Sequence, residues 1–384
     1  MIFQAMGAKY TFSSATRYLF AGGNESDSDK LCQALKNHYS GEVTLYHKGR
    51  AALAEAIRLA TGGRGNVAIS GLTCYSVVQA VKAAGCTPIF IDINEDDLQF
   101  SADELRKHKD IKAVVIQNML GLPADIVSIE RATREMNAVL IEDLAHSAGA
   151  SYSDGREVGT VGDITMLSFG KDKAIDVVNG GALIIRGDYK AKQPTKAPKH
   201  QMKDRLYPSI AWWTRVFYPI GLGKYIMALA IKLSLVSRSA DGEVDTAEML
   251  PHWQAKLALR QIENLSNIAK ERHQKAKIYI ENLQKTVPKA VKQAGSAPAR
   301  LPLLVDNRDE VIAVLHGNGI QANDIWYDVP VSPIRFYKKA NYSEKDCPVA
   351  VNVASRLINL PTHERITSEN IIKITEIVNR VAQQ

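Results

Sequence analysis

The sequence has few cysteines, and they are not arranged for metal binding or cross-linking. The four are far apart and form no C-x-x-C pair: Cys32, Cys74, Cys86 and Cys347. We therefore expect neither a zinc site nor a disulfide framework. A reducing, cytoplasmic location is expected instead. The N-terminus also lacks the charged start and long apolar stretch of a secretory signal peptide.

Long apolar runs and dinucleotide-binding motifs are missing as well. A transmembrane helix needs about 20 mainly apolar residues, but Lys224 and Lys232 interrupt the most apolar window. No Gly-x-Gly-x-x-Gly follows the first predicted strand, which excludes a Rossmann-type NAD site. The formal charge of +7 is too diffuse to indicate nucleic-acid binding, although it suits anionic, phosphorylated substrates.

What the sequence does contain is typical of an α/β enzyme. The length of 384 residues predicts about two domains, and 46% hydrophobic content is ordinary for a globular protein. Helical and apolar strand segments alternate over residues 49–187, and the strand runs are continuously apolar. This pattern predicts a parallel sheet covered on both faces. The expected strands are 67–70, 88–93, 113–117, 138–141, 164–169 and 182–185.

The pattern changes after Pro251. A long amphipathic helix is expected from Trp253 to about Gln284, followed by a strand at 301–305 and helices at 308–318 and 368–381. We therefore predict a large α/β domain over residues 1–250, with an insert at about 188–245, and a smaller α+β domain over 251–384.

Two charged residues follow strand ends in the predicted sheet. Lys173 lies just beyond the strand that ends at Phe169, and Asp143 ends another strand. Ligands bind at the carboxyl ends of parallel strands, so both side chains are expected in one cleft. A partly desolvated lysine there suits Schiff-base chemistry, and the carboxylate suits a pyridinium nitrogen. Taken alone, a lysine in this position is usually a solvated loop residue, and an aspartate is usually a helix cap.

Further motifs surround these two residues in a fixed order. They are Gly49-Arg50-Ala51-Ala52-Leu53, Thr73, Gly121-x-Pro123-Ala124-Asp125, Ile141-Glu142-Asp143 with His146 and Gly149, Val158-Gly159-x-x-Gly162-Asp163, Ser168-Phe169-x-x-x-Lys173, Gly180-Gly181 and Asn359-Leu360-Pro361. Together they resemble the DegT/StrS family of PLP-dependent sugar aminotransferases, over roughly residues 40–187 and 246–384. The resemblance implies the PLP-dependent transferase fold type I, related to aspartate aminotransferase.

The resemblance also implies roles for individual residues. Lys173 is the expected Schiff-base lysine; Lys171 is its nearest rival, but only Lys173 has the family's spacing from Ser168 and Gly180. Asp143 is expected to keep the ring nitrogen of pyridoxal 5'-phosphate protonated.

Other residues are expected around the cofactor. Gly49 and Arg50, at a helix start, and Ser168 would bind its phosphate. His146 would contact its ring or ring oxygen, and Asn118 would face the same cleft. For these last two, a purely structural role is an equal alternative.

Two positions depart from the family pattern. The family commonly has an aromatic residue, stacked on the cofactor, after the threonine that Thr73 matches, but here the residue is Cys74. A thiol packs on a π face more weakly. The family also has a Tyr-Asn-Tyr-Arg segment whose Asn reaches the phosphate in the neighbouring subunit, whereas here the stretch is Thr246-Ala247-Glu248-Met249. Both departures bear on sugar specificity more than on the cofactor.

The function expected from the resemblance is transfer of an amino group from an amino acid, glutamate being the expected donor, to a keto-sugar. The sugar is expected to be nucleotide-linked, the pathway one of surface polysaccharide or amino-sugar biosynthesis, and the enzyme a homodimer. A sugar dehydratase of the same family would have histidine in place of Lys173. The alternative from another class is a non-catalytic or membrane-associated assembly protein that retains the fold.

The insert has an unusual composition. Six basic residues within 190–205 precede an aromatic and aliphatic stretch at 206–236 that includes Trp212, Trp213, Phe217 and Tyr218. We expect helices outside the sheet that pack on the enzyme or on a second subunit. A peripheral membrane contact through residues 190–236 is the second interpretation, because basic and amphipathic segments side by side bind membrane surfaces.

Overall fold

The computed structural model describes residues 2–3, 9–236, 240–322 and 326–382. Its centre is a seven-stranded sheet in the order β2-β9-β8-β7-β6-β3-β5. The strands are β2 (Glu42–Tyr46), β3 (Asn66–Ser70), β5 (Thr87–Ile91), β6 (Ile111–Ile116), β7 (Val139–Asp143), β8 (Ile164–Ser168) and β9 (Gly181–Ile185). The predicted α/β sheet and its six expected strands are confirmed, β2 is an additional strand that was not expected, and one expected strand differs in direction.

The difference is β9, which runs antiparallel to both of its neighbours, β2 and β8. A parallel neighbour requires a long crossover, usually through a helix, whereas an antiparallel one does not. The chain passes from β8 to β9 through residues 169–180, which form no helix. This loop carries Lys173 and therefore follows the carboxyl end of a parallel strand.

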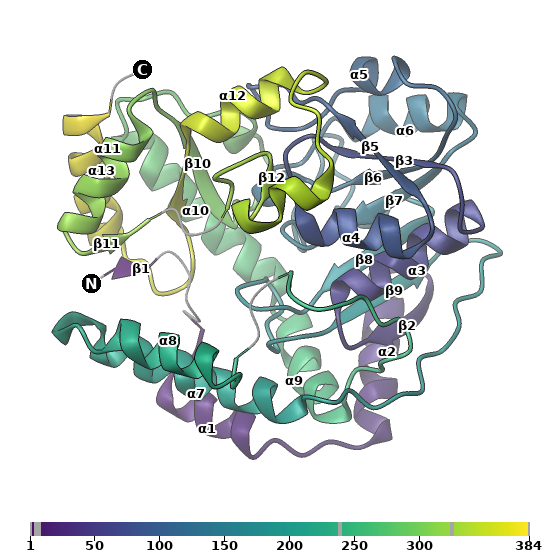
Figure 1. The fold of residues 1–384 in the computed structure, drawn as a ribbon, viewed down its shortest axis with the longest axis horizontal. Helices are drawn as coiled ribbons and strands as arrows, with labels where there is room; N and C mark the ends of the chain where they lie inside the picture. Colours follow the sequence, from purple (N-terminus) through teal and green to yellow (C-terminus); the bar gives the residue numbers. More distant parts are fainter. Residues whose placement is uncertain (1, 4–8, 237–239, 323–325, 383–384) are drawn as a thin grey trace.

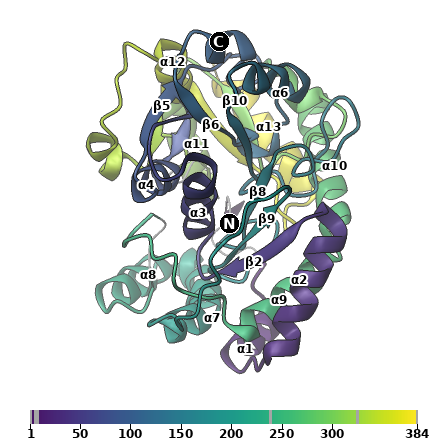
Figure 2. The ribbon, with the colours of Figure 1, turned by 90° about the vertical axis from the view of Figure 1, so that its right-hand side faces the viewer.

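Helices cover both faces of the sheet, as the continuously apolar strands predicted (Figures 1 and 2). Successive residues of β8 and β9 point into two different hydrophobic cores. Leu167 and Ala182 belong to the first core, and Met166 and Leu183 belong to the second. The first core includes residues of α2, α6 and α9, and the second residues of α3 and α4. The bounds are α2 (Glu25–Tyr39), α3 (Gly49–Thr61), α4 (Tyr75–Ala83), α6 (Ile126–Glu135) and α9 (His252–Ile262), and the short α5 (Ala102–Arg106) contacts α6.

The C-terminal part packs in a third hydrophobic core, which also includes residues of the sheet part such as Leu72, Ile93 and Met119. It contains the antiparallel pair β10 (Arg300–Leu304) and β13 (Leu357–Pro361), with α10 (Leu265–Asn282), α11 (Arg308–Gly317), α12 (Pro348–Arg356) and α13 (Ser368–Val381). Two short pairs join it to other regions. The first residues, β1 (Ile2–Phe3), pair with β11 (Ile320–Gln321), and β12 (Val331–Ser332) pairs with β4 (Thr73–Cys74).

The single helix predicted from Trp253 to about Gln284 is wrong. The chain forms two helices, α9 and α10, with a turn at Glu263 and Asn264. The backbone N–H of Asn264 donates to the carbonyl of Gln261, three residues back, at 3.2 Å. No glycine or proline marks this break. It lets α9 pack on α2 while α10 packs on α13.

The insert forms the helices α7 (Gln201–Phe217) and α8 (Gly223–Lys232), joined by a 3-10 turn at Tyr218–Ile220. Helix α1 (Phe12–Leu19) packs on α7, and both views place α1, α7 and α8 below the sheet (Figures 1 and 2). The predicted helices outside the sheet are confirmed. Within the part of the chain described by the structure, no helix combines the length and the apolarity needed to span a bilayer.

Buried Asp176 fixes the loop that carries Lys173. Its carboxylate accepts hydrogen bonds from the hydroxyl of Tyr10 at 2.6 Å and from the backbone N–H groups of Asp172 and Val178, both at 2.9 Å. The Tyr18 hydroxyl donates to the backbone carbonyl of Asp176 at 2.5 Å. Residues distant in sequence thus hold Lys173 in one place relative to the sheet.

We predict that Asp176→Asn destabilises the fold, because the new amide group places an N–H donor among groups that donate to the carboxylate. The free energy of unfolding should fall by about 1–3 kcal/mol. Denaturant unfolding checks this, with Asp309→Asn as control because the Asp309 side chain is 96% exposed. Equal stability of the two variants would show that other contacts hold the loop.

Candidate active site

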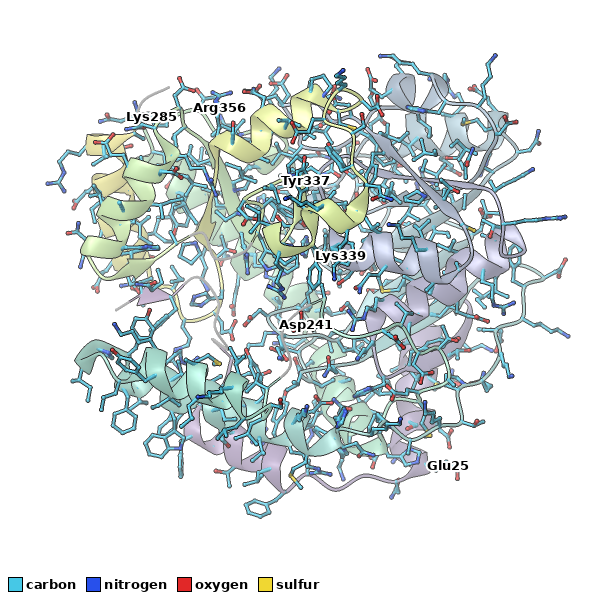
Figure 3. All side chains as sticks on the ribbon, viewed as in Figure 1. Glu25, Asp241, Lys285, Tyr337, Lys339 and Arg356 are labelled. Carbon is cyan, nitrogen blue, oxygen red and sulfur yellow. The ribbon has the colours of Figure 1, made fainter. Side chains whose placement is uncertain are left out.

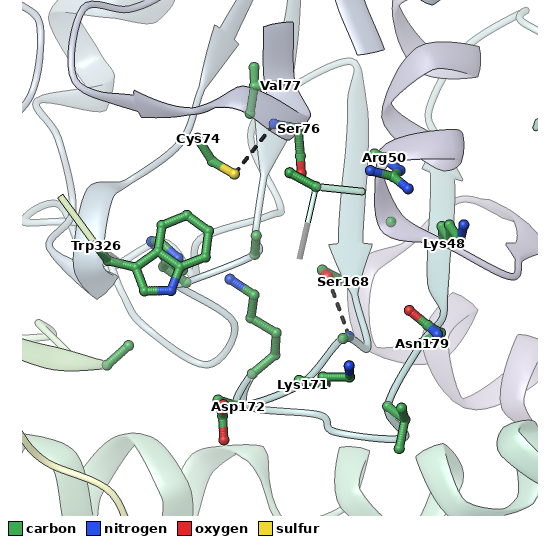
Figure 4. A pocket seen from close by; sticks show the side chains of 18 of the residues that line it. Lys48, Arg50, Cys74, Ser76, Val77, Ser168, Lys171, Asp172, Asn179 and Trp326 are labelled. Atoms are coloured by element: carbon green, nitrogen blue, oxygen red, sulfur yellow. Dashed lines mark hydrogen bonds between the residues drawn. The ribbon is translucent and has the colours of Figure 1, made fainter. Parts of the chain in front are cut away.

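A cavity of about 780 Å³ lies at the carboxyl ends of the parallel strands. Its walls come from the sheet, from the C-terminal part and from α7 and α8 of the insert. Seven of the eight predicted site residues line it: Gly49, Arg50, Cys74, Asp143, His146, Ser168 and Lys173. In Figure 4, Cys74 and Trp326 lie on one side of the cavity and Lys48, Arg50 and Asn179 on the other.

The environment of Lys173 lowers the pKa of its amine. Burial lowers the pKa of Lys173 to about 8; the charge of Arg300 lowers it further, while Cys74 and Asp143 act in the opposite direction. Its Nζ lies 5.6 Å from the centre of the Trp326 ring. An amine with this pKa is partly unprotonated near neutral pH and can attack a carbonyl carbon.

Asp143 ends β7 and is only 2% exposed. Burial raises the pKa of its carboxyl to about 6, opposed by the backbone N–H of Ala145, which donates to it at 2.9 Å, and by the charge of Lys173. The carboxylate is therefore ionised at neutral pH. It is suited to stabilise a cation bound in the cavity.

The neighbouring Glu142 holds the downstream glycine motif in place. Its buried carboxylate accepts hydrogen bonds from the backbone N–H groups of Gly159 at 2.7 Å and Gly162 at 2.6 Å. The hydroxyl of Tyr152 donates to it at 2.7 Å. Because side chains alternate along a strand, Glu142 anchors the loop while Asp143 faces the cavity.

The start of α3 fits an anion such as a phosphate. No side chain caps this end, so its first backbone N–H groups and the helix dipole are directed toward the cavity rim. A Cβ added to Gly49 would lie 3.0 Å from the Oγ of Ser168, so the serine hydroxyl is close to the helix start. The Nε of Arg50 is buried without a hydrogen-bond partner in the part of the chain that is described. The residues present thus fit a phosphorylated cofactor.

His146 and Cys74 occupy the region near Lys173. The Nδ1 of His146 accepts from the backbone N–H of Leu120 at 3.3 Å, and burial holds the pKa of the imidazole well below its usual value. The ring is therefore neutral, with its proton on Nε2. The Sγ of Cys74 accepts from the backbone N–H of Ser76 at 3.3 Å, and burial raises the pKa of the thiol.

Asn118 is the predicted site residue that does not line the cavity. Its amide donates to the Tyr152 hydroxyl at 3.0 Å and accepts from the backbone N–H of Ala124 at 2.9 Å. These bonds favour the structural alternative for Asn118. The preceding residue, Gln117, lines the cavity instead and accepts from the Thr73 hydroxyl at 2.6 Å.

Several residues in the cavity wall were not identified from the sequence. Trp326 and Arg300 belong to the C-terminal part, and Tyr207 comes from α7. The rival lysine, Lys171, also lines the cavity, with its Nζ 3.9 Å from the centre of the Tyr207 ring. Burial lowers the pKa of Lys171 to about 8 as well.

The family model described as the DegT/DnrJ/EryC1/StrS aminotransferase family matches residues 29–379, which is nearly the whole chain. The chain belongs to this family. GDP-perosamine synthase of Escherichia coli O157:H7 is 25% identical over 355 residues, covering 90% of this chain and 87% of the relative. UDP-N-acetyl-3-dehydro-alpha-D-glucosamine 3-aminotransferase of Acidithiobacillus ferrooxidans is 24% identical, covering 86% of this chain and 82% of the relative.

Solved structures of other proteins share the fold. DesV of S. venezuelae superposes with a TM-score of 0.72 at 19% identity, covering 96% of this chain and 93% of DesV. The PLP-form of Spr1654 from Streptococcus pneumoniae gives a TM-score of 0.70 at 18% identity, covering 97% of this chain and 96% of that one. The fold is thus the PLP-dependent transferase fold type I, as predicted, and the chain is a member of a PLP-dependent sugar aminotransferase family.

We predict that Lys173, and not Lys171, reacts with the aldehyde of added pyridoxal phosphate. Lys173 has the ionised Asp143 close by to attract a protonated ring, whereas Lys171 lies against Tyr207. Borohydride reduction followed by peptide mapping identifies the modified residue. Labelling should persist in Lys171→Gln and be lost in Lys173→Gln, and a labelled Lys171 beside an unlabelled Lys173 would contradict the assignment.

A second prediction concerns stability in the absence of cofactor. The folded pKa of Lys173, about 8, is below the ordinary 10.5, so its charge opposes folding. This cost to the free energy of folding is fully present below pH 8, and it disappears as the pH rises to 10.5, the pKa of the lysine in the unfolded chain. Lys173→Met should therefore stabilise the cofactor-free protein at pH 7 by roughly 2 kcal/mol.

Thermal or denaturant unfolding at several pH values checks this. The gain should shrink as the pH rises from 8 to 10.5. Lys373→Met, at an exposed position of α13, is the control and should not change stability in this pH-dependent way. A gain independent of pH would mean that packing of the methionine, rather than removal of the charge, is responsible.

Proposed function

We propose that this protein transfers an amino group from an amino acid, glutamate in our proposal, to a nucleotide-linked keto-sugar, with pyridoxal phosphate as cofactor. The observation that carries the proposal is the pairing, in one cavity, of a lysine amine of pKa about 8 with a carboxylate of pKa about 6. Burial also lowers the pKa of Lys171 to about 8, so the pairing of Lys173 with Asp143 in one cavity, rather than the pKa of the lysine alone, supports the proposal.

Each residue would have one task. Gly49, through its backbone N–H, and Ser168, through its hydroxyl, would hold the phosphate, and Asp143 would keep the ring nitrogen protonated. Pyridoxal phosphate, when bound, supplies the electron sink that acidifies the α-carbon of the amino donor. The Nζ of Lys173 would accept the proton from that carbon and return it to the acceptor side, as a general base and then a general acid.

Charges around the cavity support a phosphorylated sugar substrate. Its lining includes Lys48, Lys171, Arg300 and Arg335, in addition to the residues assigned to the cofactor. Cationic side chains attract the phosphates of a nucleoside diphosphate. The GDP- and UDP-linked sugars in the names of the two relatives support the same substrate class. A role in polysaccharide or amino-sugar biosynthesis follows from this proposal.

We also propose a homodimer, supported by the family resemblance. The 246–249 stretch matches the segment that reaches the neighbouring subunit in the family. Here the backbone of this stretch forms hydrogen bonds within the chain. The N–H of Met249 donates to the carbonyl of Lys196 at 2.9 Å, and the N–H of His47 donates to the carbonyl of Glu248 at 3.0 Å. A subunit contact in this protein would therefore use other residues to approach the phosphate.

We predict that Asp143→Asn still binds pyridoxal phosphate but turns over slowly, because a neutral amide cannot stabilise a protonated ring nitrogen. The loss in kcat should be on the order of a hundredfold or more, each tenfold being about 1.4 kcal/mol in the barrier. Stopped-flow absorbance with glutamate as the sole substrate measures this half-reaction. In the unmutated enzyme, the cofactor band near the visible edge should disappear when glutamate is added.

Asp172→Asn is the matched control, since Asp172 lines the same cavity but does not end a strand. It should retain most of the rate. Near-normal turnover by Asp143→Asn would contradict the role of Asp143. Failure of glutamate, but not of another amino acid, to change the spectrum would contradict only the choice of donor.

A further inference from the structure

Exposed apolar side chains are concentrated on one face of the protein. Of the fourteen large apolar side chains that are exposed among the described residues, eleven belong to residues 12–20 and 202–235. On α8 and the turn before it, Ile220, Tyr225, Leu229 and Leu233 are each more than half exposed. We call the outer side of α1, α7 and α8 the apolar face. Soluble monomers rarely leave an apolar surface of this extent uncovered.

The apolar face is separate from the cavity although it shares a helix with it. Met227 and Ile231, on the inner side of α8, line the cavity, whereas Tyr225 and Leu229 point outward. Figure 3 shows side chains that extend from α7 and α8 away from the rest of the protein, while Asp241 lies between the insert and the remaining structure. Since the inner side already packs, the outer apolar side chains are not needed to hold α8 in place.

The charge of residues 190–236, the central part of the insert, is strongly one-sided, whereas Asp188, Asp241, Glu243 and Asp245 lie at the two ends of the insert. Residues 190–236 include nine lysines and arginines but only one acidic residue, Asp204. Asp204 is buried, and its carboxylate pairs with His47 at 2.8 Å. Lys224 and Lys232 are exposed on α8, beside the outward apolar side chains. Lys224 and Lys232 therefore give the apolar face its positive charge, whereas Lys196, elsewhere in the segment, pairs with Asp245 at 2.5 Å.

Aromatic rings add a third feature. On α7, Trp213 stacks on Phe217 with ring centres 5.3 Å apart, and Phe12 of α1 contacts Trp212 at 5.3 Å. Tryptophan and tyrosine are enriched where proteins meet the polar boundary of a bilayer. Apolar, basic and aromatic residues on one exposed helical surface are the combination found in helices that lie on membranes.

We propose that the apolar face binds the surface of a membrane that contains anionic phospholipid. A second copy of the chain fits less well, because a two-fold interface brings the same patch together from both subunits. Lys224 and Lys232 would then face a surface with the same charge and no exposed carboxylate from residues 190–236. A bilayer provides both an apolar interior and negative headgroups. Docking holds the cavity wall formed by α8 next to the lipid surface.

Sedimentation of the full-length protein with vesicles tests this proposal. Binding is expected to vesicles that contain phosphatidylglycerol, to weaken as salt is raised, and to be much weaker with phosphatidylcholine alone. Leu229→Glu with Leu233→Glu should weaken binding by about tenfold or more, since two side chains no longer enter the bilayer. Replacing Lys224 and Lys232 by Gln should cost about fivefold each, and only with anionic vesicles.

The matched controls are Ile372→Glu and Lys373→Gln, which change an exposed aliphatic residue and its basic neighbour on α13. Both should bind as the unmutated protein does. Thermal unfolding must first show that all variants are folded. Absence of binding to either vesicle would overturn the proposal. So would a dimer that the Leu229 and Leu233 changes convert to monomer without any effect on vesicle binding, since that result assigns the face to a second copy.

Discussion

The candidate site depends on the enclosure of one amine. Lys173 can act as a nucleophile near neutral pH only if its charged form is disfavoured, and burial provides that cost. The same cost opposes folding, so the loop that carries Lys173 must be held by other interactions. Asp176 meets this requirement, because its carboxylate collects hydrogen bonds from Tyr10 of the N-terminal segment and from the loop backbone. Reactivity at residue 173 is thus maintained by contacts made three residues away.

Opposite charges are placed so that they do not neutralise this amine. Asp143 acts on Lys173 but no ion pair between them is found within the described residues, so the two groups can each interact with a ligand that lies between them. Glu142, one residue earlier, is fully used in holding the loop at 159–162. Two adjacent carboxylates therefore serve different purposes because a strand directs them to opposite faces.

Much of the site was predictable from the sequence because it depends on local rules. Parallel strands end at one edge, so Asp143, Ser168 and Lys173 had to be neighbours. Of the two alternatives for Asn118, its contacts favour the structural one: with a left-handed backbone, φ of 45°, it bonds to Tyr152 and Ala124, and Gln117 lines the cavity instead. Trp326 and Arg300 could not be predicted, since they reach the cavity through packing between distant segments, for which the sequence carries no periodic signal. The break between α9 and α10 was hidden for a similar reason: only their different packing partners specify it.

Helix α8 of the insert lines the cavity with one side and forms part of the apolar face with the other. With 3.6 residues per turn, the positions of Met227 and Ile231 face the cavity while those of Tyr225 and Leu229 face outward. Substitutions on one side of α8 can therefore change what enters the cavity without altering the outer surface, and the reverse also holds. If the outer surface binds a membrane, the cavity is presented at the lipid boundary by the same ten-residue helix that forms its wall. In that case the insert would place the protein at a membrane without changing the residues at the strand ends.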